Sequence, residues 1–202
     1  MNTDEINRAL EEKGYFSQEK FLDDKICDLI CDTYIDINNP KFFIDAKVGK
    51  GLGKTSNETI RKSSIRWITD WDENPSLNKL NLIFTEIMES SKVYFRLPLK
   101  RFESQVALYN NGGFYRTHLD QHPKTRHRQI SCTLYLNNCE KGGELVLYKK
   151  GSKTQVQETV LPRKGTIVLF ASADIYHEVK VVHDERYSIT TWFRDDEIEP
   201  FI

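Results

Sequence analysis

Apolar residues near the start of the chain recur about 3.6 positions apart, which is typical of amphipathic helices. Asn2 and Glu5 have the spacing of a capping box, so we expect a first helix to begin there. Ser17 is the expected cap of a second helix, and Pro75 and Ser76 are expected to open a third. The apolar positions are Ile6 and Leu10 in the first helix, Phe21, Leu22, Ile26, Leu29 and Ile30 in the second, and Leu77, Leu80, Ile83, Phe84, Ile87 and Met88 in the third.

From Phe102 onward the pattern changes to short runs of β-branched and aromatic residues between glycine-rich turn signals. The eight expected strands are 106–109, 114–119, 129–136, 144–148, 156–161, 166–170, 177–182 and 187–193. Eight strands with turns at such spacing predict a double-stranded β-helix, or jelly roll. We therefore expect a mainly β fold with flanking helices (α+β), in which the N-terminal helices pack on one sheet of the jelly-roll core.

The length of 202 residues and the hydrophobic content of 39% are sufficient for one substantial core. We expect a single domain over 1–202, with helical support and a loop at 1–100 and the jelly-roll core at 101–195. Within the first part, 42–48 is strand-like and the glycine-rich stretch after it is expected to be a mobile loop. Its sequence GKGLGKT resembles a phosphate loop only superficially. A phosphate loop has four residues between its first glycine and the Gly-Lys-Ser/Thr end, whereas here three residues lie between Gly49 and Gly53.

The charged residues are nearly balanced, with 29 basic and 30 acidic side chains and a net charge of -1. No whole-molecule field therefore draws the protein towards nucleic acid or anionic lipid, and we expect neither as a partner. Apolar runs such as 165–173 are too short for a membrane span, and the start lacks the apolar stretch of a signal peptide. We expect a cytoplasmic monomer whose four cysteines are reduced and structural.

His118 and Asp120 lie two positions apart in a strand-like run, so their side chains point to the same side. One more histidine from a distant strand would complete a two-histidine, one-carboxylate facial triad, which suits non-haem Fe(II), and His177 is the candidate. Arg186, nine residues later, can hold the far carboxylate of a dicarboxylic co-substrate in a bidentate fork. Taken alone, however, the His-x-Asp pair is equally compatible with a surface ion pair or a turn.

Five blocks of sequence, in this order, resemble the prolyl 4-hydroxylase group of the 2-oxoglutarate oxygenases, particularly its hypoxia-type branch and the bacterial relatives of that branch. They are IRKSSIRWI at 60–68, VALYNNGGFYRTHLDQH at 106–122, RQISCTLYLN at 128–137, GGELVLY at 142–148, and HEV with RYSITTWFR within 177–194. The resemblance implies that His118, Asp120 and His177 hold Fe(II) and that Arg186 pairs with the C5 carboxylate of 2-oxoglutarate.

The resemblance also implies further contacts. The expected cofactor-binding residues are Tyr109, Tyr135, Thr190 and Trp192, and the expected substrate-binding residues are Arg61, Trp67 and Arg128. The segment 60–68 is similar to a mobile loop that closes over the substrate. It carries Ser63 where relatives often have aspartate, which puts substrate closure in question.

The expected activity is that of a dioxygenase stimulated by ascorbate, which hydroxylates a prolyl residue, at C4, in a protein or peptide and produces succinate and CO2. For bacterial relatives a translation factor is a plausible target. Two alternatives stay open: an oxygenase acting on a small molecule or nucleic acid, and a non-catalytic jelly-roll binding module. The neutral charge balance disfavours a nucleic-acid substrate.

Overall fold

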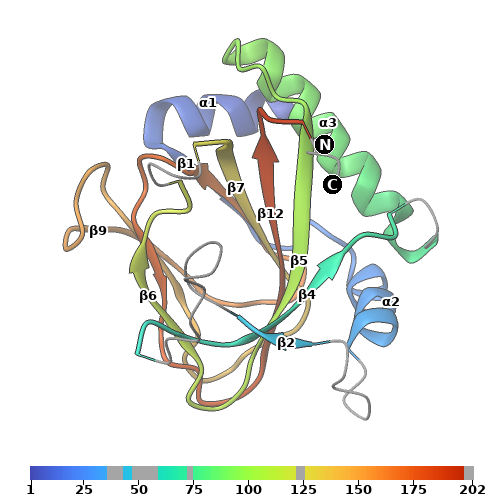
Figure 1. Cartoon of the computed structure of the whole chain (residues 1–202), viewed down its shortest axis with the longest axis vertical. Coiled ribbons are helices and arrows are strands. Elements are labelled where there is room, and N and C mark those ends of the chain that lie inside the picture. The colour runs from blue at the N-terminus through green and yellow to red at the C-terminus, as the bar shows by residue number, and fades with distance from the viewer. Residues whose placement is uncertain (36–42, 47–58, 72–74, 122–125, 198–202) are drawn as a thin grey trace.

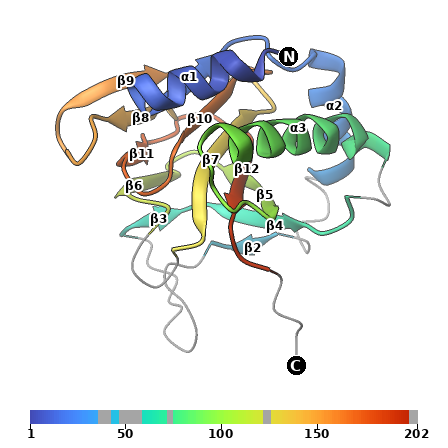
Figure 2. The same ribbon diagram turned by 90° about the horizontal axis from the view of Figure 1, so that it is seen from above.

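Two antiparallel sheets face each other, and helices cover the outer side of the larger one (Figures 1 and 2). The computed structural model describes residues 1–35, 43–46, 59–71, 75–121 and 126–197. The larger sheet has the strand order β1-β10-β7-β12-β5-β4-β2 and the smaller sheet β3-β6-β11-β8-β9. The strands are β1 (Tyr15–Gln18), β2 (Ile44–Asp45), β3 (Arg61–Lys62), β4 (Ser64–Ile68), β5 (Arg101–Tyr109), β6 (Phe114–His118), β7 (Arg128–Tyr135), β8 (Leu145–Tyr148), β9 (Val156–Val160), β10 (Ile167–Ala171), β11 (His177–Val179) and β12 (Arg186–Arg194). The expected jelly-roll architecture with flanking helices is confirmed.

The first and third helices lie where the sequence predicts them. Helix α1 (Thr3–Lys13) begins after Asn2, whose side chain accepts a hydrogen bond from the amide of Glu5 at 3.3 Å. The third helix opens with a 3₁₀ turn, η3 (Pro75–Leu77), and continues as α3 (Asn78–Tyr94).

The predicted start of the second helix at Ser17 is wrong. Residues Tyr15–Gln18 form β1, which pairs with β10 at the edge of the larger sheet. Helix α2 (Asp24–Tyr34) begins only after Asp23, whose carboxylate accepts a hydrogen bond from the amide of Lys25 at 2.9 Å. Backbone pairing with β10 outweighs the local preference of serine for a helix cap.

All eight strands expected after position 101 are present, with ends shifted by a few residues. Two further strands, β3 and β4, occupy the segment 60–68 that was expected to be a mobile loop. β3 pairs with β6 in the smaller sheet and β4 pairs with β5 in the larger one, so this segment crosses from one sheet to the other. The expected glycine-rich loop lies outside the described residues.

The apolar side chains form two layers. Alternate residues of β12, such as Ile189 and Phe193, pack against the helices on the outer side of the larger sheet. The second layer fills the space between the two sheets and includes Leu147 and Phe170. Because strand residues alternate between these layers, Arg186, Ser188 and Thr190 of β12 point into the space between the sheets. Among the described helices, none is both long and apolar enough to cross a bilayer.

Candidate active site

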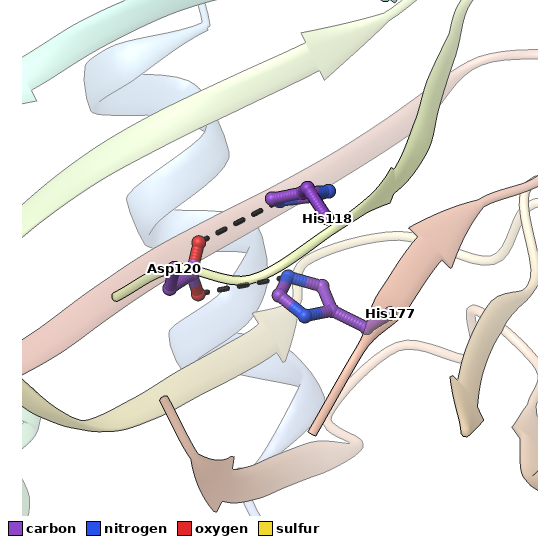
Figure 3. A group of neighbouring side chains, drawn as sticks. All are labelled: His118, Asp120 and His177. Atoms are coloured by element: carbon purple, nitrogen blue, oxygen red, sulfur yellow. Dashed lines mark ion pairs between the residues drawn. The ribbon is translucent and has the colours of Figure 1, made fainter. Parts of the chain in front are cut away.

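The smaller sheet brings His118, Asp120 and His177 together. β6 ends at His118 and β11 begins at His177, and these two residues are direct partners in the antiparallel pairing. The Nε2 atoms of His118 and His177 each lie 3.6 Å from a different oxygen of Asp120, as Figure 3 shows. One ligand atom from each residue lies within 4.8 Å of the others. Two imidazoles and one carboxylate in this arrangement suit an octahedral metal with open positions on one face.

Backbone carbonyls orient both imidazole rings. The Nδ1 atom of His118 lies 2.8 Å from the carbonyl oxygen of Arg116, and the Nδ1 atom of His177 lies 3.2 Å from that of Ile175. A carbonyl oxygen can only accept, so Nδ1 is the protonated nitrogen in each neutral ring. Both Nε2 atoms, which face Asp120, are therefore left with lone pairs for a cation.

The Asp120 carboxylate is held from the larger sheet. The hydroxyl of Ser131 on β7 donates to its Oδ2 at 2.7 Å, and this hydroxyl also lies 2.7 Å from that of Ser172. Burial opposes ionisation of Asp120, but the two neighbouring histidines and Arg128 outweigh it and hold the pKa of this carboxyl well below its usual value. Asp120 is therefore an anion that offers its oxygens to a metal.

His177 is a neutral ligand at ordinary pH. Burial, reinforced by the nearby charge of His118, lowers the pKa of His177 to about 4. A neutral imidazole carries the lone pair that metal binding requires, so no proton has to be displaced from this ring near neutral pH.

Arg186 at the start of β12 is a buried cation. Its side chain is 2% exposed, and it donates from Nε to the carbonyl oxygen of Gly143 at 3.0 Å and from Nη1 to the hydroxyl of Ser188 at 3.1 Å. Gly143 has a φ of +74°, which favours glycine, and an added Cβ would lie 3.1 Å from the Cδ of Arg186. Within the described part of the chain, no carboxylate forms a salt bridge with this guanidinium.

Aromatic rings flank the Arg186 guanidinium, whose central carbon lies 5.0 Å from the Tyr109 ring centre and 4.8 Å from that of Tyr135. The Tyr135 hydroxyl is buried and has no hydrogen-bond partner among the described residues. Burial raises the pKa of Tyr135, although the charge of Arg186 opposes this, so the hydroxyl keeps its proton as a donor. An unpaired buried cation beside an unpaired hydroxyl forms a site for an anion.

The metal-ligand cluster and Arg186 line one cavity between the sheets. β12 also presents Thr190 and Trp192 to this cavity, and Trp192 Nε1 is another buried donor without a partner among the described residues. Trp192 pairs in register with Ser131, the residue that holds Asp120. Arg186 and Trp192 lie six positions apart on β12, so the cation and the metal ligands lie at two depths of the cavity. A short diacid chelating a metal at one end fits this layout of donors.

The three predicted substrate residues have different surroundings. Arg61 lines the cavity. Trp67 is 41% exposed, and its ring lies 6.1 Å from that of Trp192. Arg128 stacks on Trp192 at 3.6 Å and donates from Nη2 to the carboxylate of Glu103 at 2.8 Å. Arg128 and Trp67 thus both contact Trp192, and neither is among the residues that line the cavity.

Sequence reasoning missed several residues that touch the candidate metal ligands, among them Tyr115 and Ser131. The ring of Tyr115 stacks on that of His118, with centres 3.6 Å apart and planes 22° apart. Ser131 donates to Asp120, as described above. The signal for Ser131 was available, because it shares a period of two with Thr133 and Tyr135 in an otherwise apolar strand.

Comparison with known proteins shows which proteins this chain resembles. A family model described as the 2OG-Fe(II) oxygenase superfamily matches residues 104–194, which hold the metal-ligand cluster and Arg186. The solved structure of a Pseudomonas putida prolyl-4-hydroxylase superposes with a TM-score of 0.83 at 27% identity, over 97% of this chain and 100% of that one. The chain is therefore similar to the prolyl 4-hydroxylases of the 2OG-Fe(II) oxygenase superfamily.

Two further proteins are similar over most of this chain. The Arabidopsis thaliana protein named "Probable prolyl 4-hydroxylase 7" is 27% identical over 88% of the chain, and the chain spans 61% of that protein's length. A Trichoplax adhaerens prolyl hydroxylase, solved with a hypoxia inducible factor peptide fragment, has a TM-score of 0.83 at 22% identity, over 96% of this chain and 89% of that one. At that identity the second comparison shows the common fold.

Proposed function

We propose that this protein is an Fe(II)- and 2-oxoglutarate-dependent dioxygenase that hydroxylates a prolyl residue, at C4, in a protein or peptide, with succinate and CO2 as the other products. The observation that carries this proposal is the buried Arg186, which lacks a carboxylate partner among the described residues and lines the same cavity as the metal-ligand cluster. A binding module has no need of a diacid site next to a metal site, whereas this co-substrate needs both.

His118, Asp120 and His177 are the residues that would hold the iron. When bound, iron and 2-oxoglutarate supply the oxidising chemistry, which no protein side chain can provide. Arg186 would bind the far carboxylate through a fork, and the Tyr135 hydroxyl would donate a second contact. Thr190 and Trp192 would contact the co-substrate along β12, and Phe170 and Leu145 would exclude water from the cavity.

The prolyl substrate is supported by the relatives. The similar proteins from Pseudomonas putida and Arabidopsis thaliana bear the name prolyl 4-hydroxylase, and the Trichoplax adhaerens structure contains a peptide fragment. The translation factor, the stimulation by ascorbate, the monomeric state, the cytoplasmic location and the absence of nucleic-acid substrates stay predictions.

Mass spectrometry of the proteome tests this proposal. Cells with the gene, cells without it, and cells complemented with Asp120→Ala are compared for prolyl residues that gain one oxygen atom. We expect at least one such proline only in cells with the unaltered gene, and its acid hydrolysate should co-elute with 4-hydroxyproline. A protein that forms succinate from 2-oxoglutarate while no proline changes would contradict the prolyl substrate and leave the oxygenase class intact.

A further inference from the structure

The residues that line the cavity carry an excess of positive charge. Among the described residues that line it, Asp120 is the only carboxylate, and the two cations are Arg61 and Arg186. On the proposed function, the metal lies against Asp120 and the co-substrate diacid pairs with Arg186. The charge of Arg61 then has no counterpart inside the cavity.

Arg61 is half-buried and held in place without being neutralised. Its Nε atom donates to the hydroxyl of Ser63 at 2.7 Å, and its guanidinium carbon lies 4.7 Å from the centre of the Tyr115 ring. Within the described part of the chain, it forms no salt bridge with a carboxylate. The hydroxyl of Ser63 is neutral, so it fixes the side chain and leaves the full positive charge for another group.

Arg61 also lies close to the metal ligands. β3 and β6 pair with Arg61 directly opposite Tyr115, and the Tyr115 ring stacks on His118 at 3.6 Å. The Tyr115 ring therefore contacts both the guanidinium of Arg61 and a candidate metal ligand. A substrate whose reacting carbon lies at the metal must place its adjoining groups within reach of Arg61.

The other predicted substrate arginine is different. Arg128 donates from Nε at 3.1 Å and from Nη2 at 2.8 Å to one oxygen of Glu103, so its guanidinium is already paired with a carboxylate of the protein. Arg194 donates to this same oxygen at 2.7 Å. Arg128 therefore supports Trp192 by stacking, and of the two arginines only Arg61 both lines the cavity and lacks a carboxylate partner among the described residues.

We propose that Arg61 selects acidic substrates, which are peptides with an aspartate or glutamate carboxylate beside the prolyl residue that enters the cavity. This inference rests on the proposed function for the position of the proline. A charge-assisted hydrogen bond at a half-buried site changes affinity by about tenfold or more. The attraction weakens as salt is raised, because part of the site is open to solvent.

Short blocked peptides with one central proline provide the probe. Asp or Asn is placed at each neighbouring position in turn, and each peptide is titrated into protein loaded with Mn(II) and 2-oxoglutarate. Binding is followed by tryptophan fluorescence, since Trp67 and Trp192 lie near the cavity. We expect at least one position where Asp binds about tenfold more tightly than Asn. No such position, or no binding by any peptide, would overturn the proposal.

Variants assign the preference to Arg61. Arg61→Gln should abolish it and Arg61→Lys should retain part of it, whereas Lys62→Gln, which removes the same charge from the adjacent exposed residue, should leave it unchanged. Ser63→Asp should also abolish it, because a carboxylate in place of the hydroxyl would neutralise Arg61. A preference that survives in Arg61→Gln contradicts the assignment. Hydroxylation of the same peptides is measured separately, so an Asp preference without hydroxyproline would refute the proposed reaction and not the acidic recognition.

Discussion

Replacement of Arg186 by lysine tests whether the anion site needs the two parallel hydrogen bonds of a guanidinium or only a positive charge. Of the five N–H donors of an arginine, the structure uses one on Gly143 and one on Ser188, which leaves three for a carboxylate. Lysine keeps the charge but cannot form two parallel bonds from a planar group. Loss of one charge-assisted hydrogen bond, worth about 1.5–3 kcal/mol, should raise the 2-oxoglutarate requirement about tenfold to hundredfold.

Ligand-induced stabilisation measures this effect without turnover. At a concentration of about 100 times its Kd, 2-oxoglutarate should stabilise the unaltered protein loaded with Mn(II) by about 2.7 kcal/mol. At the same concentration a tenfold weaker site gives about 1.4 kcal/mol, so the midpoint of thermal unfolding should rise less for Arg186→Lys. Mn(II) binding in the absence of 2-oxoglutarate should be unaffected, which shows that the variant is folded.

Arg194→Lys is the matched control. Arg194 lies on the same face of β12 and is also buried, but it is already paired with Glu103 and Asp196. Its replacement should leave the response to 2-oxoglutarate unaltered. Equal responses of Arg186→Lys and the unaltered protein, or an equal loss in both variants, would refute the assignment of the anion site to Arg186.

Four further outcomes are expected. His118→Ala and Asp120→Ala should each abolish succinate formation, and turnover that persists with both residues replaced would contradict their role as ligands. Ser131→Ala removes the hydrogen bond that orients Asp120, so metal affinity measured by titration should fall about 10- to 100-fold, and unchanged affinity would count against this support. Tyr135→Phe deletes an unpaired buried hydroxyl, so urea unfolding should show equal or greater stability while the KM for 2-oxoglutarate rises; a fall in stability would indicate a partner for this hydroxyl. The metal-free protein should lose up to about 3 kcal/mol of its free energy of unfolding as pH falls from 6.5 to 4. The reason is that His177 takes up a proton at a higher pH in the unfolded chain than in the folded one. In His177→Gln this part of the pH dependence of stability should be absent.

Local patterns predicted most of the fold. The alternation within the strands after position 101 and the cap at Asn2 depend on neighbours in sequence, and both were read correctly. The failures were non-local. Tyr15–Gln18 and the segment 60–68 become strands only because β10, β5 and β6 offer them backbone partners, which no short window of sequence reveals.

The residues of the candidate site likewise include some that local sequence predicts and some that depend on contacts between distant segments. The expected strand period predicted that His118 and Asp120 share one side, although β6 ends at His118. His177 was a candidate from its sequence context, but the pairing of distant segments that brings it to His118 is seen only in the structure. Arg61 and Arg128 are both arginines, so the sequence alone does not distinguish their roles. They differ in the structure because Arg128 is paired with Glu103, a residue 25 positions away in the sequence that the sheet brings next to it. Such partners are fixed by tertiary register and are therefore visible only in the structure.

Anaerobic titration with Fe(II) and 2-oxoglutarate tests the central claim directly, namely that one cavity holds a metal through three side chains and a diacid through a fourth. The unaltered protein should develop a weak metal-to-ligand absorption band in the visible range when both are added and not with either alone. The band should be absent in Asp120→Ala and should need a higher 2-oxoglutarate concentration in Arg186→Lys. No band in the unaltered protein, or the same band in Asp120→Ala, would contradict the account.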